Sequence, residues 1–288
     1  MKKSELILNP DGSVYHLNLK PEHIATNIIF VGDQYRVDKI SKHFDTIEFT
    51  TQKREFKTTT GTYKNNQFSI ISTGIGPDNI DIVMNELDAL VNIDLQTRKP
   101  KEKLTSLNIV RIGTSGSLQA DIPVDSFIIS SHALDLNGML HSYQIEKISN
   151  PEIENAFVKH TNWSAKRAAP ILIDNHKELE NKLTSEETYL GITATAGGFY
   201  GPQGRVLRLN LQDDDLNQKI DSFSYNDHRI TNLEMETSAI YGLAKLLGHN
   251  ACSISAIMAN RANGTFSKSP DKLMANLISY TLEKLVKI

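Results

Sequence analysis

The sequence predicts an α/β protein in which helices cover a parallel or mixed β-sheet, and three observations support this fold class. Short apolar runs typical of buried strands alternate with segments whose apolar residues recur at helical spacing. The length of 288 residues allows a large core. No internal repeat or proline-rich linker divides the chain, so we expect one domain spanning residues 1–288.

The expected elements follow in chain order. Strands are predicted at 27–32, 67–76, 107–117, 125–134, 189–201 and 249–261, the third of them running into a glycine-rich turn. Helices are predicted at 36–44, 79–92, 232–248 and 272–288. Two polar segments, 93–107 and 211–218, are expected at the surface, the second as a loop or the start of a helix.

Two carboxylates, Glu234 and Glu236, fall in the first turn of the predicted helix 232–248, which Gly248 ends. Acidic side chains are favourable there by about 0.3–1 kcal/mol each, because the N-terminus of a helix carries partial positive charge. They can therefore be purely structural. A role in a binding site requires partners elsewhere in the chain.

Composition excludes several classes of protein. The net charge is −3 with acids and bases mixed along the chain, which argues against nucleic acid as a partner. Cys252 is the only cysteine and the histidines are scattered, so we expect neither a disulfide within the chain nor a metal site. No apolar run is long enough for a membrane span or a signal peptide. We expect a cytoplasmic protein without a membrane partner.

Polar side chains that follow apolar strands are candidate ligand-binding groups, because ligands gather at the carboxyl ends of parallel strands. Arg36, Thr114, Gln203 and Asn260 occupy such positions. Arg111 differs from them, because it lies inside an apolar run. A buried arginine is costly unless it is paired, so Arg111 requires a partner.

The segment GTSGS at 113–117 follows Arg111 directly. In a turn, its backbone N–H groups and the Thr114 hydroxyl can cradle an anion, and a guanidinium binds phosphate oxygens as a fork. Phosphate is therefore one interpretation of Arg111. A buried ion pair with Glu234 or Glu236 is the other.

The segment GGFYGPQGR at 197–205 combines aromatic, amide and guanidinium groups. Gln203 and Arg205 are two residues apart, so an extended chain places both on one side. An amide can pair with an N–H and a carbonyl together, and arginine can bind a second carbonyl. An exposed loop with no ligand is the alternative. The glycine-rich segment at 72–79 fails the dinucleotide-binding pattern, so we interpret it as a tight turn.

Taken together, these segments resemble the nucleoside phosphorylase family, and within it the uridine phosphorylases. The match runs in family order from His16 to Arg261. The motifs that carry it are GDQYR at 32–36, where Gln34 replaces the family's proline, REF at 54–56, RIGTSG at 111–116, ALDLNG at 133–138 and NLEMETSA at 232–239.

The resemblance implies a three-layer αβα sandwich around a central mixed β-sheet. It also implies reversible phosphorolysis of uridine to uracil and ribose 1-phosphate, with inorganic phosphate as co-substrate and no other cofactor. The assembly would be a homodimer or homohexamer whose active sites are shared between subunits. Glu55 and Ser72 are the candidate ligands of an interface cation that some relatives hold.

The same resemblance assigns roles to residues. Phosphate would be bound by Gly32, Arg36, Arg111 and Thr114, with Arg54 supplied by a neighbouring subunit. Ribose would be bound by Met235, Glu236 and a neighbour's His16, and the base by Ser115, Gly116, Phe199, Gln203 and Arg205. The catalytic set would be Arg111, Thr114, Gln203 and Arg205. Glu234 would either hold Arg205 or Arg261 in place or only favour the helix start.

One position separates substrates within the family. Purine-cleaving relatives carry an aspartate after the last core strand, which protonates purine N7, whereas this chain has Asn260 followed by Arg261. The expected substrate is therefore a pyrimidine nucleoside. The base loop at 197–204 departs from the family in its glycines and its Gly-Pro order. The alternatives are a purine nucleoside phosphorylase or nucleosidase of the same family, or a nucleoside-binding homologue without catalysis.

Overall fold

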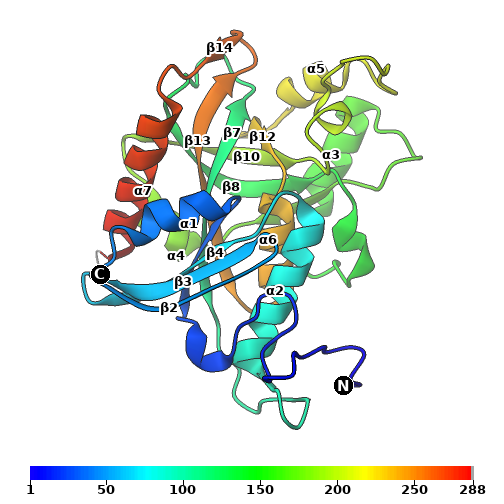
Figure 1. The fold of residues 1–288 in the computed structure, drawn as a ribbon. Helices are drawn as coiled ribbons and strands as arrows, with labels where there is room; N and C mark the ends of the chain where they lie inside the picture. The colour runs from blue at the N-terminus through cyan, green and yellow to red at the C-terminus, as the bar shows by residue number, and fades with distance from the viewer. Residues whose placement is uncertain (287–288) are drawn as a thin grey trace.

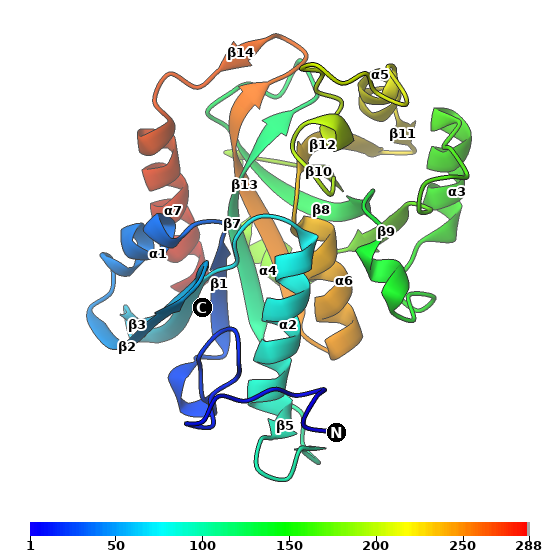
Figure 2. The same cartoon turned by 45° about the vertical axis from the view of Figure 1, so that its right-hand side comes forward.

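The computed structural model describes residues 1–286 (Figures 1 and 2). The strands are β1 (Asn27–Val31), β2 (Thr46–Lys53), β3 (Phe56–Tyr63), β4 (Asn66–Ser72), β5 (Ile93–Asp94), β6 (Lys99–Pro100), β7 (Asn108–Ser117), β8 (Phe127–Asp135), β9 (Ile171–Asp174), β10 (Thr188–Thr195), β11 (Ser224–Tyr225), β12 (His228–Glu234), β13 (Asn250–Asn260) and β14 (Thr265–Phe266).

The helices alternate with these strands. They are α1 (Gln34–Ser41), α2 (Pro77–Asn92), α3 (Pro151–Thr161), α4 (Lys177–Leu183), α5 (Leu216–Asp221), α6 (Thr237–Leu247) and α7 (Pro270–Val286), with short 3-10 turns η1 (Pro21–His23), η2 (Met139–Ser142) and η3 (Gly201–Gln203). The last two residues of the predicted helix 272–288 lie outside the described residues.

One mixed sheet of twelve strands forms the centre of the molecule, in the order β11-β12-β10-β8-β13-β7-β1-β4-β3-β2 with β9 beside β8 and β14 beside β13. β1 runs parallel to both β4 and β7, whereas β2 and β3 form an antiparallel hairpin. β12 also pairs with the end of β7, through Leu233 opposite Gly116. This extra pairing closes β7, β13, β8, β10 and β12 into a ring and brings the ends of β7 and β12 together.

Helices cover both faces of the sheet, as Figure 2 shows for α2 and α6 on one face and α1 and α7 on the other. One core cluster joins α2 and α6 to side chains such as Phe30 and Ile109. A second joins α1, α4 and α7 to Ile29, Val110 and Ile254. Successive residues of a strand point to opposite faces, so Ile29 and Phe30 enter different layers. The predicted three-layer α/β architecture is confirmed.

The prediction of one helix over 232–248 is wrong at its start. Residues 228–234 form β12, and α6 begins only at Thr237. All residues from Ile230 to Glu234 are buried, because both sides of this strand are covered, and a fully buried run shows no strand alternation. The predicted end is confirmed, since Gly248 adopts a left-handed conformation with φ of 81°.

The predicted glycine-rich turn at 113–117 is also wrong, because β7 continues through it to Ser117. Packing explains why a glycine occupies position 113 of this strand. A Cβ added to Gly113 would lie 1.8 Å from Nη1 of Arg111, so the absent side chain leaves the space that the Arg111 guanidinium fills. The polar segment 93–107 contains the β5–β6 hairpin, and 211–218 includes the start of α5. No helix among residues 1–286 is long and apolar enough to cross a membrane.

Cys252 offers a test of the packing. It is buried on β13, and burial raises the pKa of its thiol to about 12, with a further contribution from the Glu180 charge. Because the thiolate is the reactive form, we expect iodoacetamide to leave native protein unmodified at pH 7.5 and to alkylate it after denaturation. Intact mass measures both. Rapid alkylation of native protein would show that β13 is not packed as described.

Candidate active site

The candidate site lies where β1 ends, beside the middle of β7 and the start of α6. Arg36 comes from the first turn of α1, directly after β1, and Arg111 comes from β7, the parallel neighbour of β1. Glu236 precedes α6, and Gly76 precedes α2. Four segments far apart in sequence therefore meet at one edge of the sheet.

Arg111 is buried and lies between two carboxylates. Its Nη2 is 2.5 Å from Oε2 of Glu236 and 3.3 Å from Oε2 of Glu234, and its Nη1 donates to Ser255 at 3.4 Å. Burial lowers the pKa of Arg111, but the charges of both carboxylates outweigh that effect, so the net shift is upward. The ion-pair interpretation of Arg111 is confirmed with both glutamates.

Glu234 supports the start of α6. Its carboxylate accepts the Thr195 hydroxyl at 2.7 Å and the backbone N–H groups of Glu236 and Thr237 at 2.9 to 3.0 Å. These are N–H groups that a helix leaves unpaired at its beginning. Glu234 contacts neither Arg205 nor Arg261, so that prediction is wrong, and the role at the helix start is confirmed.

Glu236 is buried, with one partner on each carboxylate oxygen. Oε1 accepts the backbone N–H of Gly76 at 2.8 Å, and Oε2 binds Arg111. Burial raises the pKa of Glu236, Arg111 opposes the rise and the Glu234 charge adds to it. Each carboxylate oxygen has two acceptor positions, so Glu236 keeps capacity for two further donors. Met235, beside it, is half-buried.

Gly76 is a site residue that the sequence pattern did not predict. It adopts a φ of 97°, which glycine accepts without strain and which directs its N–H to Glu236 across 160 residues of sequence. The segment 72–79 was predicted only as a tight turn. Its glycine-rich passage from strand to helix was the one signal available.

Arg36 lies close to Arg111. Its Nη1 donates to the Ile112 carbonyl at 3.2 Å, and its Nη2 is 3.1 Å from Asp33, the residue that caps α1. Burial lowers the pKa of Arg36, Asp33 opposes this, and the positive charge of Arg111 lowers it further. Two neighbouring guanidiniums that repel each other favour an anion between them. Gly32 leads into this turn from β1.

Thr114 lies three residues beyond Arg111 on β7 and is half-buried. Ser115 is more deeply buried, and its hydroxyl accepts the Asn232 amide at 3.0 Å. Gly116 faces the Arg261 side chain, whose Cδ would lie 3.7 Å from an added Cβ. The structure therefore places Ser115 against β12 and Gly116 against Arg261.

Arg54 and His16 lie apart from these residues. Arg54 is exposed at the tip of the β2–β3 hairpin, where its carbonyl accepts the Gln34 amide at 2.5 Å. The His16 ring contacts Glu86 on α2 at 2.7 Å. Within one chain, neither has a hydrogen bond or ion pair to a predicted site residue among residues 1–286. The Ser72 hydroxyl donates to the Glu55 carbonyl and accepts the Lys57 N–H, so it fixes the same hairpin.

The base loop (residues 197–204) is not extended, and the strand predicted over 189–201 ends at Thr195 instead. η3 and the left-handed Gly204, with φ of 69°, turn the chain. Arg205 nevertheless reaches back, and its Nη1 donates at 2.5 Å to both the Gln203 side-chain oxygen and the Phe199 carbonyl. Its guanidinium stacks on Phe199 at 3.9 Å. Gln203 is buried, and its Nε2 donates to no residue within 1–286.

Arg261 is a second residue whose place in the site was missed. Its Nη2 donates to the Gln203 carbonyl at 2.8 Å, and its Nη1 is buried without a hydrogen-bond partner in the described chain. Burial lowers the pKa of Arg261, and the nearby Arg205 charge adds to this. An unpaired buried donor beside the base loop is suited to a polar ligand.

Comparison with known proteins shows the family. The model of the phosphorylase superfamily matches residues 26–287. The chain belongs to the phosphorylase superfamily. It is therefore a member of an enzyme family, whose uridine phosphorylases are pentosyltransferases, and the family resemblance predicted from the motifs is confirmed.

Individual relatives of this phosphorylase superfamily member cover nearly all of it. A uridine phosphorylase of Thermococcus kodakarensis is 30% identical, over 96% of this chain and 88% of that protein. One of Haemophilus influenzae is 28% identical, over 96% and 95%. Purine nucleoside phosphorylases of Listeria monocytogenes also match, at 26% identity over 94% and 99%.

A solved structure shows the same fold. The nucleoside phosphorylase of Trypanosoma brucei, described as showing uridine phosphorylase activity, superimposes with a TM-score of 0.88. It is 29% identical and covers 98% of this chain and 100% of its own. The likeness covers 98% of the chain and therefore most of the sheet and its helical layers.

Proposed function

We propose that this phosphorylase superfamily member is a uridine phosphorylase, which converts uridine and phosphate reversibly to uracil and ribose 1-phosphate. The observation that carries the proposal is the proximity of Arg36, which follows β1, to Arg111, which lies within β7 beside the carboxylate of Glu236. Two guanidiniums suit phosphate, and a carboxylate suits adjacent sugar hydroxyls. Gly32 and Thr114 complete the proposed phosphate site, and Met235 the ribose site.

In the proposed reaction, the glycosidic bond loosens first and the sugar gains oxocarbenium character. Phosphate, held by the arginines, attacks C1′, and the uracil anion leaves with its charge spread over O2 and O4. Gln203 Nε2 and the guanidinium of Arg205 are the groups that stabilise this charge. Positioning and electrostatics supply the catalysis, with no covalent enzyme intermediate. No metal or organic cofactor takes part in this scheme.

Asn260 favours a pyrimidine over a purine substrate. Its amide N donates to the carbonyls of Gln119 and Ile122, both at 2.8 Å, and its oxygen accepts the Asn263 N–H. An amide cannot act as the acid that N7 of a purine requires. Here, moreover, both donor hydrogens are committed to the backbone.

We expect Asn260→Asp to destabilise the protein by about 1–3 kcal/mol without creating purine phosphorolysis, because a carboxylate would face two carbonyl oxygens. Thermal unfolding and an inosine assay measure the two effects. The neighbouring exposed change Asn263→Asp is the control for added charge. Appearance of inosine cleavage would contradict the structural role of Asn260.

We further propose that active sites are shared in a homodimer or homohexamer, with Arg54 reaching a neighbour's phosphate and His16 its ribose. Arg54→Ala is expected to raise the KM for phosphate about ten-fold, the loss of one charge-assisted contact, and to leave stability unchanged because Arg54 is exposed. Lys64→Ala, on another exposed hairpin turn, is the control. An unchanged KM would contradict the shared site.

A substrate panel tests the proposed function. In phosphate buffer, uridine is expected to release uracil while inosine releases no base. The rates with thymidine and deoxyuridine show how strongly the reaction depends on the ribose 2′-hydroxyl. Cleavage of inosine alone would favour the purine enzyme. Binding of uridine in a calorimeter without turnover would favour a homologue without catalysis. We propose a cytoplasmic location, where salvage substrates are present.

A further inference from the structure

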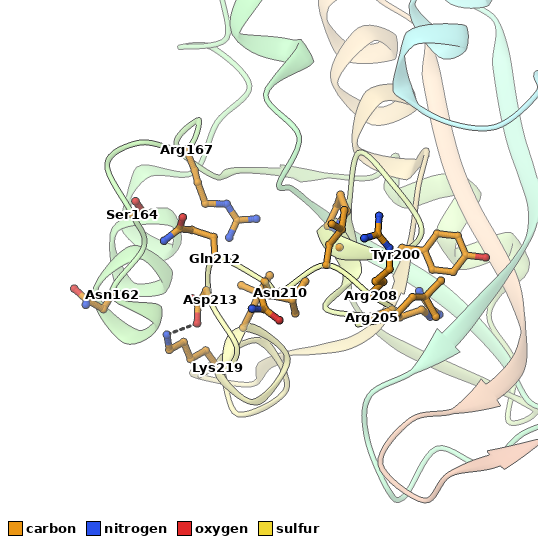
Figure 3. Close-up of a pocket in the computed structure, with 16 residues that line it drawn as sticks. Asn162, Ser164, Arg167, Tyr200, Arg205, Arg208, Asn210, Gln212, Asp213 and Lys219 are labelled. Atoms are coloured by element: carbon orange, nitrogen blue, oxygen red, sulfur yellow. Dashed lines mark hydrogen bonds and ion pairs between the residues drawn. The ribbon is translucent and has the colours of Figure 1, made fainter.

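A cavity of about 910 Å³ is lined in part by the base loop (Figure 3). The segment after α3 forms one side of it, and residues 200–219 form the other. In Figure 3, Arg167 stands on one side and Tyr200, Arg205 and Arg208 on the other. Of the residues assigned to phosphate, ribose or base, only Arg205 lines this cavity.

The cavity is cationic in a chain whose net charge is −3. Its lining contains four basic residues, Arg167, Arg205, Arg208 and Lys219, and one acidic residue, Asp213. Asp213 is already paired with Lys219 at 2.8 Å. The three arginines form no ion pair with any acidic residue within 1–286, so the lining lacks an anion to balance them.

Arg167 shows the imbalance most clearly. It is half-buried and stacks on the Trp163 ring at 3.9 Å, but its guanidinium donates to no residue in the described part of the chain. Burial lowers the pKa of Arg167, and the Asp213 charge opposes this decrease. Partial burial of an unpaired cation costs free energy, which an anionic ligand would offset.

Residues 200–219 also bring apolar side chains to the cavity. Leu207 and Leu209 are 77% and 74% exposed. Leu211, Leu216, Pro202 and Tyr200 line the cavity with them. Inorganic phosphate would be too small for this volume and would not use these side chains. Cavities of about 300–1,000 Å³ usually hold organic molecules that combine an apolar body with a few polar groups.

We propose that this cavity binds a phosphorylated ligand with a planar ring, that is, a ligand of the nucleotide class. The arginines bind the phosphate, and the leucines and Tyr200 pack against the ring. Binding does not depend on the reaction proposed above. Because Arg205 belongs to both places, a ligand in the cavity would be positioned to affect the base loop.

Trp163 provides the readout, because it is the only tryptophan and stacks on Arg167. Titration with UMP or AMP is expected to change its fluorescence saturably, whereas uridine or inorganic phosphate at equal concentrations does not. Arg208→Gln is expected to weaken nucleotide binding about ten-fold or more, the loss of one charge-assisted contact. Arg208 is exposed, and its side chain has no hydrogen bond or ion pair with another residue within 1–286.

Two further variants complete the test. Lys166→Gln removes an exposed charge outside the cavity and is expected to bind nucleotide as the wild type does. Arg36→Gln, in the proposed phosphate site, is expected to lose phosphorolysis but keep nucleotide binding. The proposal is overturned if neither nucleotide binds, if phosphate alone gives the same change, if Arg208→Gln binds normally, or if Arg36→Gln abolishes binding.

Discussion

Replacing Arg111 by alanine is expected to reduce kcat/KM for uridine phosphorolysis about 10³-fold or more, as loss of a principal electrostatic donor does in other enzymes. The same change is expected to lower the free energy of unfolding by about 3–5 kcal/mol, because it leaves buried charge without a partner. Glu234 and Glu236 would then face each other across an emptied space. Steady-state kinetics and denaturant unfolding measure the two losses.

Arg111→Lys is the matched variant for this prediction. It keeps the charge that the two glutamates require but removes the fork that binds phosphate oxygens in pairs. We therefore expect most of the stability to return while activity stays at least about 100-fold low. If Arg111→Lys were fully active, or if Arg111→Ala lost stability without losing activity in the folded fraction, Arg111 would be a structural residue only.

The second large effect is expected for Glu236→Gln. An amide cannot accept hydrogen bonds from two sugar hydroxyls while also accepting from Arg111 and Gly76. We expect kcat/KM for uridine to fall about 100-fold, which corresponds to two charge-assisted hydrogen bonds. With 2′-deoxyuridine, which lacks one hydroxyl, the loss is expected to be about ten-fold smaller.

Glu234→Gln is the control, because Glu234 is just as buried and also contacts Arg111. Its oxygens accept from Thr195 and the start of α6, so its loss is expected to cost stability, about 1–3 kcal/mol. The preference for uridine over deoxyuridine should stay as in the wild type. An equal change of preference in both variants would contradict the assignment of ribose to Glu236.

The sequence was most informative where chemistry and local pattern conflict. An arginine inside an apolar strand requires a buried partner, so an ion pair of Arg111 with Glu234 or Glu236 was one of the two interpretations that the sequence allowed. The predicted strands were recognisable as apolar runs and the predicted helices by their helical apolar spacing, whereas β2, β3, β9, α3 and α4 were not predicted. β12 was mistaken for the beginning of a helix because every residue from Ile230 to Glu234 is buried, which removes the period.

The rest depended on contacts between distant segments. Gly113 was predicted to be part of a turn. In the structure it lacks a side chain at the place that the Arg111 guanidinium occupies. Gly76 and Glu236 meet across 160 residues, which no local pattern predicts. Arg167 gave no signal as an isolated basic residue, and only the path of residues 200–219 places it on a cavity wall.

The phosphate requirement tests the central claim most directly. Purified protein is incubated with uridine while phosphate is raised from zero, and uracil, ribose 1-phosphate and free ribose are all measured. We predict no uracil release without phosphate, saturation as phosphate rises, and one ribose 1-phosphate for each uracil. Release of uracil and free ribose at the same rate without phosphate would show hydrolysis and would contradict the proposed role of Arg36 and Arg111.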